Sequence, residues 1–269
     1  MLERLIATED EEVGRRLESL FARKGIEIRT GVKLKTFSVR GGGVEALLES
    51  GEKLEFEKVL VAIGRRPRLE GLGLEKMGIQ LEKGAIRVNA FLETSVSGIF
   101  AIGDVTSRST GLAHGATAEG IRVVENLKGT RRPMDDTAVP NCIYTDPEIA
   151  SVGAFKADRA DVIEAKVLFS SLGKSHVEGE TEGFLKMAAS KKDGKILRVS
   201  AIGAHATELI HEAVLAIQAG ITVETLAGTV HAHPTESEIL QKAAEKLLSL
   251  DTVKSSDTMR PFLKRIVKS

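Results

Sequence analysis

The sequence predicts a mixed fold, with α/β organisation in the first half of the chain and α+β organisation in the second. Up to residue 133, short strand-like segments are interspersed with segments of helical periodicity. From residue 137 onward, five strand-like segments come first and three helices follow, which is typical of an α+β domain. Arg131, Arg132 and Pro133 interrupt the preceding helix and mark the boundary between the two halves.

The first predicted element is a helix that begins with Thr8 as its cap and ends at Gly25. The four residues after Thr8 are acidic, and the helix dipole favours negative charge in the first turn. An apolar stripe along one face predicts packing on a core, and it consists of Val13, Leu17, Leu20 and Phe21.

Strands are predicted next at residues 26–28, 32–39, 44–48 and 54–63, joined by glycine-rich turns. Residues 41–46 match the pattern G-x-G-x-x-G/A, which in dinucleotide-binding proteins leads into a helix whose N-terminus receives the pyrophosphate. The segments on both sides of these glycines have the character of strands. We therefore expect a hairpin turn at this position and no phosphate site.

The middle of the chain is predicted to hold a short helical link at residues 71–78 and short strands at 86–88 and 99–102. A helix follows at residues 115–127, and its apolar face consists of Ala118, Ile121, Val124 and Leu127.

The second half is predicted to contain five strands, at residues 142–145, 149–154, 162–169, 184–190 and 195–203. The three helices after them are predicted at residues 205–219, 222–227 and 235–248. The last residues, 251–269, are rich in Lys and Arg and are predicted to form a solvated basic tail.

Composition excludes several classes of function. The 269 residues include 38 basic and 38 acidic side chains, so no general attraction to nucleic acid or acidic membranes is indicated. No apolar run approaches the roughly 20 residues that span a bilayer, and the acidic start lacks a signal-peptide core. We therefore expect a cytoplasmic protein that binds neither nucleic acid nor membrane. The single cysteine, Cys142, lies in an apolar segment and is expected to be a buried structural thiol, and no histidine has zinc-ligand spacing.

His233 and Glu238 form the most informative pattern in the chain. Pro234 forces His233 toward extended geometry, and a helix is predicted to start at Thr235, with Glu238 in its first turn. A carboxylate that holds one imidazole nitrogen leaves the other free to accept a proton, as a general base does. The same residues also match a capping box, Thr235-x-x-Glu238, which has no catalytic role. The pattern alone leaves both interpretations open.

Three further stretches complete the set of motifs. Residues 94–104 predict a turn and a short strand that ends at Gly103 and Asp104, where a carboxylate is well placed to bind a ligand hydroxyl. Residues 59–67 read VLVAIGRRP, and residues 141–153 read NCIYTDPEIASVG. In this order the motifs resemble the FAD-dependent pyridine nucleotide-disulfide oxidoreductases, and among them the C-terminal half of the dihydrolipoamide dehydrogenases. The resemblance runs from about residue 1 to residue 248.

The resemblance implies an arrangement of domains. Residues 1–68 correspond to part of an NAD-binding domain, and residues 69–133 to the C-terminal segment of the FAD-binding domain. Residues 134–250 correspond to the dimerisation domain, and residues 251–269 extend past the usual end of the family as the basic tail. The expected fold is therefore an α/β remnant of nucleotide-binding domains followed by an α+β dimerisation domain.

The resemblance also assigns roles to individual residues. His233 is the implied base that deprotonates a dihydrolipoamide thiol, with Glu238 as its orienting partner, and the pair acts in the active site of the second subunit of a homodimer. Gly64 and Val32 are the implied NAD contacts. The implied FAD contacts are Asp104, Gly111, Leu112, Ala113 and His114.

The front half of the family pattern has no counterpart in this sequence. The two G-x-G-x-x-G motifs for FAD and NAD and the paired redox cysteines are missing, and one cysteine cannot form an internal disulfide. We expect a chain that is catalytically incomplete alone and does not retain FAD or NAD in stoichiometric amounts. A separate chain could supply the front half, and a lipoyl-bearing dehydrogenase complex is the implied larger partner. The alternatives are a non-catalytic dimerisation protein, or a fragment of another disulfide reductase such as glutathione or mercuric reductase.

Overall fold

The computed structural model describes residues 2–154 and 159–250. Contacts within the chain divide it into two compact units. One unit joins the residues up to Leu60 with those from Pro140 onward, and the other consists of Val61–Val139. The predicted basic tail lies outside the described residues, and the domain boundaries expected from the sequence remain a prediction.

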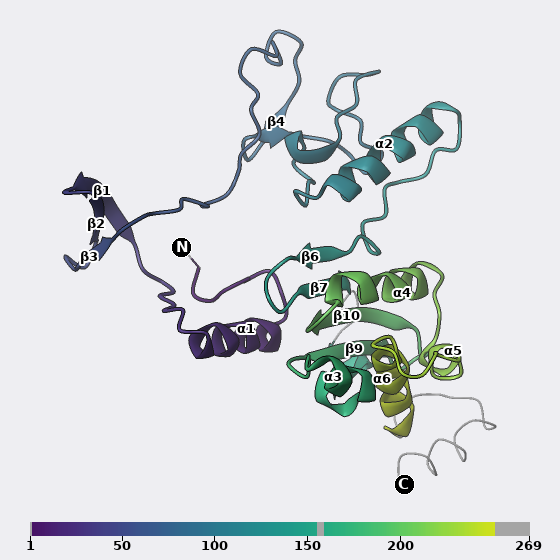
Figure 1. The fold of residues 1–269 in the computed structure, drawn as a ribbon. Coiled ribbons are helices and arrows are strands. Elements are labelled where there is room, and N and C mark those ends of the chain that lie inside the picture. Colours follow the sequence, from purple (N-terminus) through teal and green to yellow (C-terminus); the bar gives the residue numbers. More distant parts are fainter. Residues whose placement is uncertain (1, 155–158, 251–269) are drawn as a thin grey trace. The chain divides into compact units, whose positions relative to one another are not determined.

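The first unit is built on a five-stranded antiparallel sheet (Figure 1). Its strand order is β6-β7-β10-β9-β8, and neighbouring strands are antiparallel throughout. The strands lie within two residues of the predicted positions, at Asn141–Ile143, Ile149–Gly153, Ile196–Ile202, Phe184–Ser190 and Val162–Leu168 in the order given. The prediction of five strands followed by helices is confirmed.

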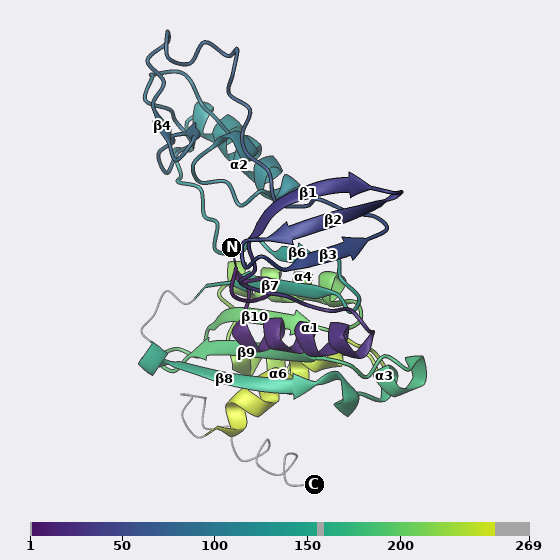
Figure 2. The ribbon, with the colours of Figure 1, turned by 90° about the vertical axis from the view of Figure 1, so that its left-hand side faces the viewer.

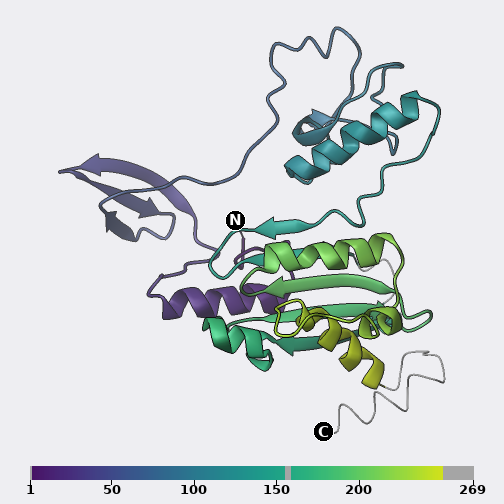
Figure 3. The same ribbon diagram turned by 45° about the vertical axis from the view of Figure 1, so that its right-hand side comes forward.

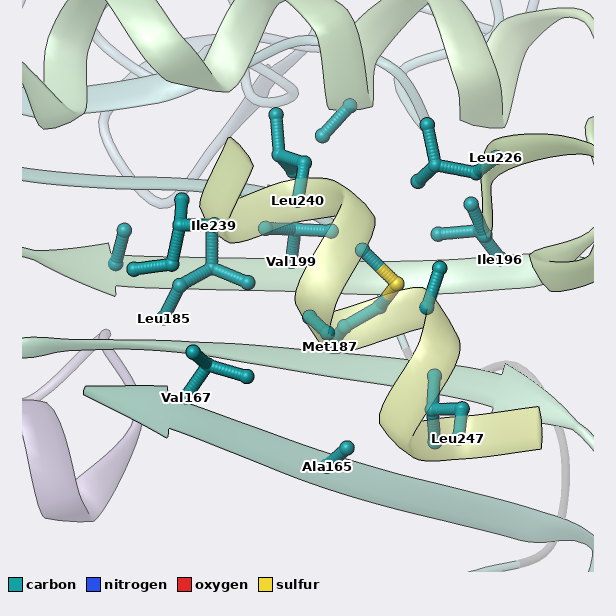
Figure 4. Close-up of a cluster of buried hydrophobic side chains, with 14 of the residues drawn as sticks. Ala165, Val167, Leu185, Met187, Ile196, Val199, Leu226, Ile239, Leu240 and Leu247 are labelled. Carbon is teal, nitrogen blue, oxygen red and sulfur yellow. The ribbon is translucent and has the colours of Figure 1, made fainter. Parts of the chain in front are cut away.

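Three helices, α4 (Ala206–Gln218), α5 (Val223–Ala227) and α6 (Glu238–Ser249), cover one face of this sheet (Figure 3). Alternate strand residues point to them, because successive side chains of a strand lie on opposite faces. Figure 4 shows Ile239, Leu240 and Leu247 of α6 packed on Leu185, Met187 and Val199 of the sheet. The short helix α3 (Gly173–Glu178) was not predicted from the sequence.

Helix α1 (Glu11–Arg23) covers the opposite face of the same sheet (Figure 2). Its side chains Val13, Leu17 and Leu20 pack against strand residues that alternate with those facing α4 and α6, namely Ile149, Phe184 and Ile202. The predicted stripe therefore faces a core, although the cap differs from the prediction. Asp10, rather than Thr8, is the N-cap, and its carboxylate accepts a hydrogen bond of 2.9 Å from the Glu12 N–H.

Charged side chains also join the start of α1 to the sheet. Lys186 of β9 lies between α1 and the sheet with its side chain 13% exposed, and its ammonium donates to Asp10 at 2.9 Å and to Glu12 at 3.0 Å. Partial burial lowers the pKa of Lys186, but the hydrogen bonds to Asp10 and Glu12 outweigh this effect and raise it overall. The lysine therefore stays charged and joins the start of α1 to the sheet.

The glycine-rich pattern at residues 41–46 is a hairpin, as predicted. Strands β1 (Leu34–Arg40), β2 (Gly43–Leu48) and β3 (Lys53–Phe56) form an antiparallel sheet in that order. Gly41 and Gly42 have φ of 55° and 91°, the left-handed geometry that a two-residue hairpin turn requires. The strand predicted at residues 26–28 does not form, and the strand predicted at 54–63 ends at Phe56, because no described strand pairs with residues 26–28 or 57–63.

The second unit has a small core of Leu74, Ile79, Ile86 and Ala101. Its regular elements are β4 (Leu81–Glu82), β5 (Ala85–Ile86), a 3-10 turn at Gly103–Val105 and helix α2 (Ala113–Leu127). Two predictions in this unit are wrong. Residues 71–78 form turns rather than a helix, and the strand predicted at 99–102 is reduced to a single bridge between Glu93 and Phe100.

Helix α2 forms where it was predicted, but it buries a different face. Ile121, Val124 and Leu127 are more than half exposed, whereas Glu119 and Val123 are buried. The reason is a hydrogen bond of 2.6 Å from the Gly103 N–H to the Glu119 carboxylate, which turns the Glu119 side of the helix toward the loop. Apolar periodicity alone could not reveal this polar contact.

The packing of α1 leads to a stability prediction. Leu17 is 2% exposed between α1 and the sheet, so Leu17→Ala is expected to lower the free energy of unfolding by about 2–5 kcal/mol. Ser19→Ala, at an exposed position of the same helix, serves as the control and is expected to change it by less than about 0.5 kcal/mol. Urea denaturation measures both values. Equal small effects for the two variants would contradict the packing of α1 on this sheet.

Candidate active site

The α5–α6 turn (residues 228–237) carries the histidine singled out by the sequence. Helix α6 begins at Glu238 rather than at the predicted Thr235, and residues 236–237 form a turn before it. Ile239 and Leu240, the next two residues, are fully buried against the sheet. The core therefore fixes the first turn of α6, and Glu238 with it, directly beside His233.

The structure places His233 and Glu238 in contact. The His233 Nδ1 lies 3.0 Å from Oε1 and 3.2 Å from Oε2 of Glu238. The imidazole is 75% exposed, whereas the carboxylate is 17% exposed. A carboxylate accepts hydrogen bonds, so Nδ1 carries the proton and Nε2 of the neutral ring is left as a proton acceptor.

One of the two hydrogen bonds of a capping box is present. The Thr235 N–H donates to Glu238 Oε2 at 3.0 Å, as a capping box requires. The Thr235 hydroxyl, however, donates to the Ala232 carbonyl at 2.7 Å and does not cap the helix. One carboxylate therefore serves both functions, since it holds the backbone of the turn and the ring of His233.

Glu238 is ionised more readily than an ordinary glutamate. Partial burial raises its pKa, but the hydrogen bonds from His233 and from the Thr235 N–H outweigh this effect, so the pKa lies below its usual value. The position at the start of α6 also favours negative charge. The acceptor for the His233 Nδ1–H is thus a carboxylate at neutral pH.

The predicted flavin contacts lie together in the second unit. Asp104 is exposed in the 3-10 turn and not at the end of a strand, and its carboxylate lies 3.5 Å from the Ser109 hydroxyl. Gly111 has φ of 74° and leads through Leu112 into α2, where Ala113 and His114 form the first turn. Leu112 provides no side-chain cap. An exposed carboxylate beside an uncapped helix start suits a ligand with hydroxyl groups and electron-rich ring oxygens.

The predicted NAD contacts belong to different units of the chain. Val32 lies in the loop before β1, in the first unit, and Gly64 lies in the second unit. The glycine-rich pattern at residues 41–46 is a hairpin without a helix after it. This hairpin is therefore not a pyrophosphate cradle.

Sequence reasoning missed two contacts of the α5–α6 turn. His231 Nε2 lies 2.9 Å from Glu212 Oε1 of α4. Glu236 was not singled out, yet it is 6% exposed and both its oxygens lie 2.9 Å from the hydroxyl of the fully buried Ser175. Both pairs join distant segments, so no local spacing could have indicated them.

Cys142 differs in part from its prediction. It lies in β6 but is only half-buried. Partial burial raises the pKa of its thiol, and the nearby carboxylates Glu148, Glu208 and Glu9 raise it further. Because the thiolate is the reactive form, this cysteine is poorly suited to redox chemistry.

Glu236 generates a prediction about pH. Burial raises the pKa of its carboxyl above the usual value, since one hydroxyl donor from Ser175 does not offset the loss of water and the nearby Glu178 adds to the rise. The folded chain therefore favours the protonated form. At a pH below the pKa that Glu236 has in the unfolded chain, this group does not lower the free energy of unfolding. As the pH rises through the pKa that Glu236 has in the folded chain, it lowers the free energy of unfolding more and more.

Glu236→Gln is neutral at every pH, so its stability relative to the parent chain is expected to improve from about pH 4 to about pH 7. Urea denaturation at both pH values measures the change, and constant effects of the amide cancel in the comparison. Glu180→Gln, at an exposed residue after α3, controls for the general loss of one charge. A relative stability that is constant or falls with pH would contradict the burial of this carboxylate.

Comparison with known families matches most of the chain. Residues 1–120 match the model of the pyridine nucleotide-disulphide oxidoreductases, and residues 139–244 match the dimerisation domain of the same family. The second match coincides with the five-stranded sheet and helices α4–α6, and it points to self-association. No helix in the described ranges is long and apolar enough to cross a membrane.

Several curated relatives are dihydrolipoyl dehydrogenases. The protein of that name from Thermus scotoductus is 41% identical over 248 residues, which cover 88% of this chain and 53% of the relative. One from Bacillus subtilis is 41% identical over 90% of this chain and 53% of the relative. The chain thus spans about half the length of the curated relatives it matches.

Two solved structures share the fold of this chain. LpdA from Mycobacterium tuberculosis superposes with a TM-score of 0.82 at 28% identity, over 89% of this chain and 53% of that one. The flavoprotein disulfide reductase RclA from Escherichia coli, at 23% identity, shares the fold with a TM-score of 0.82 over 91% and 57% of the two chains. Together with the family models and the curated relatives, these matches show that the chain belongs to the pyridine nucleotide-disulphide oxidoreductases.

Proposed function

We propose that this chain supplies the general base and the dimer interface of a dihydrolipoamide dehydrogenase-like oxidoreductase. The observation that carries the proposal is the contact between His233 and Glu238, which leaves Nε2 on an exposed ring as a proton acceptor. Relatives named dihydrolipoyl dehydrogenase, at about 41% identity, support the choice of substrate class.

The chemistry of a dithiol substrate requires such a base. A thiol attacks a disulfide only as the thiolate, so a proton must first leave the attacking sulfur. In the proposed role, His233 accepts this proton at Nε2, and the ionised Glu238 stabilises the resulting imidazolium through Nδ1. The thiolate then attacks one sulfur of a disulfide, and the other sulfur leaves as a thiolate.

The disulfide has to come from another polypeptide segment, because Cys142 is the only cysteine of this sequence. We propose that a second chain supplies the front half, and that a lipoyl-bearing dehydrogenase complex is the larger assembly. We also propose a homodimer. Exposed apolar side chains on α4 and in the α5–α6 turn, Leu215 and Val230, are consistent with a surface that a partner covers.

FAD, when bound, would carry electrons from the dithiol to NAD. Asp104 would hold flavin hydroxyl groups, and the run of Gly111, Leu112, Ala113 and His114 at the start of α2 would favour negative charge near the ring. Gly64 and Val32 remain the proposed NAD contacts on the resemblance alone. The cytoplasmic location expected from the sequence also remains a prediction.

A non-catalytic dimerisation protein is the second candidate, and the single cysteine favours it. On this alternative His233 and Glu238 would only close the turn before α6. The two functions differ in what happens when a redox-active front half is provided.

The 269-residue chain alone is expected to show no reduction of NAD by dihydrolipoamide, since it lacks the dithiol pair through which electrons pass. It is also expected to purify without stoichiometric flavin. Absorbance spectroscopy and a standard NADH assay measure both properties. FAD-dependent turnover, or flavin near one per chain, would show that the chain is more complete than we propose.

Joining the front half of the Bacillus subtilis relative to the start of this chain is expected to give an enzyme that reduces NAD with dihydrolipoamide. In this fusion, His233→Gln is expected to lower kcat by about 10²- to 10⁴-fold, the usual contribution of a general base. His211→Gln, at an exposed histidine of α4, is the control and should leave kcat unchanged. A folded fusion that binds FAD but turns over equally with and without His233 would rule out the proposed base.

A further inference from the structure

A second histidine in the α5–α6 turn is held quite differently from the first. His231 lies two residues before His233, and its side chain is only 5% exposed, compared with 75% for His233. Its Nδ1 lies 3.0 Å from the Thr229 carbonyl oxygen and its Nε2 lies 2.9 Å from Glu212 Oε1. Both nitrogens are engaged and hardly accessible, so this ring is not available to a substrate.

The chemistry of these contacts makes them strong. The Thr229 carbonyl oxygen and the Glu212 carboxylate both only accept hydrogen bonds, so the charged ring of His231 can donate to both of them, and the neutral ring keeps the contact to Glu212 by carrying its proton on Nε2. Nε2 faces a carboxylate, and the hydrogen bond between them is charge-assisted and shielded from water. Such bonds are about twice as strong as neutral ones and impose a defined geometry on both partners.

Glu212 provides a rigid attachment point for this ring. It lies in the middle of α4, next to Ala213, which is 1% exposed against the core of the sheet. His231 therefore ties the backbone of the turn to an element that is itself fixed by apolar packing. The next residue, Ala232, is held as well, because its carbonyl accepts the hydrogen bond of the Thr235 hydroxyl.

His233 needs such support, because little else holds it. In the part of the chain that the structure describes, Glu238 is the hydrogen-bond partner of the His233 ring. A largely exposed ring stays against one carboxylate only if its own backbone is held in place. We propose that His231 is a positioning residue that fixes the ring of His233 on Glu238 by fastening the turn to α4 through Glu212. This inference extends the function proposed above and rests on it for its catalytic meaning.

The tautomer of His233 is the direct readout of this positioning. The 269-residue chain is labelled with ¹⁵N-histidine, and the ring nitrogens are observed by NMR at alkaline pH, where exposed imidazoles are neutral. The signal of His233 is assigned by its loss in His233→Gln. The parent chain is expected to show the proton on Nδ1, and Glu238→Ala, which removes the acceptor altogether, is expected to abolish this preference.

His231→Phe is expected to give a mixture of the two His233 tautomers, because its ring fills a similar space but donates no hydrogen bond to Glu212. Glu212→Gln keeps an oxygen that accepts from Nε2, and it is expected to retain the Nδ1–H form. His211→Gln, on the neighbouring exposed residue of α4, is the control. If His231 only stabilised the fold, its replacement would leave the tautomer of His233 unchanged in a folded chain.

The inference is overturned if His231→Phe has the circular dichroism of the parent chain and still shows His233 protonated on Nδ1. Should His231→Phe prevent folding, Glu212→Ala gives the same decision, since water can enter the space of the lost carboxylate. The readout does not depend on turnover. An inactive fusion enzyme would therefore count against the proposed function, whereas a retained tautomer in His231→Phe would count against the role of His231 alone.

Discussion

The packing of α6 on the five-stranded sheet is the constraint on which the candidate site depends. Ile239 and Leu240 are fully buried, and the carboxylate of Glu238 immediately before them is mostly covered. This carboxylate accepts hydrogen bonds from the Thr235 N–H and from the His233 ring. The apolar contacts of α6 therefore set the position of the His233–Glu238 pair. Precise placement of catalytic groups by a rigid, well-packed element is what a general base requires.

The same sheet is stabilised from both faces. Residues of one parity in β7, β9 and β10 face α4 and α6, and residues of the other parity face α1. The α1 side adds charged contacts through Lys186, whose burial is offset by Asp10 and Glu12. As a result, a helix from the start of the chain contributes to the unit that carries His233, although 116 residues separate its last residue, Arg23, from Pro140, where that unit resumes.

Local patterns predicted the elements well where each strand or helix has its partner within the chain. The strands around Ala150, Met187 and Val199 and the helices over them were found because alternation and helical periodicity match a two-layer core. Residues 59–63 form a continuous apolar run and were predicted to continue the strand that starts at residue 54, but no described strand pairs with them and the strand ends at Phe56. The His233–Glu238 spacing indicated the pair. The contacts of His231 and Glu236 join residues 19 and 61 positions apart, and a single sequence carries no signal for them.

Hydrogen exchange at the Thr235 amide tests the central claim most directly, namely that the core holds the α5–α6 turn rigid. This amide donates to Glu238 at the start of α6, and the packing of α6 ties it to the sheet. If the core holds the turn, this amide exchanges as slowly as the amides of β9 and β10, through opening of the whole unit. Exchange at the rate of an exposed loop, with β9 and β10 still protected, would show that the turn opens independently of the core and would contradict the account.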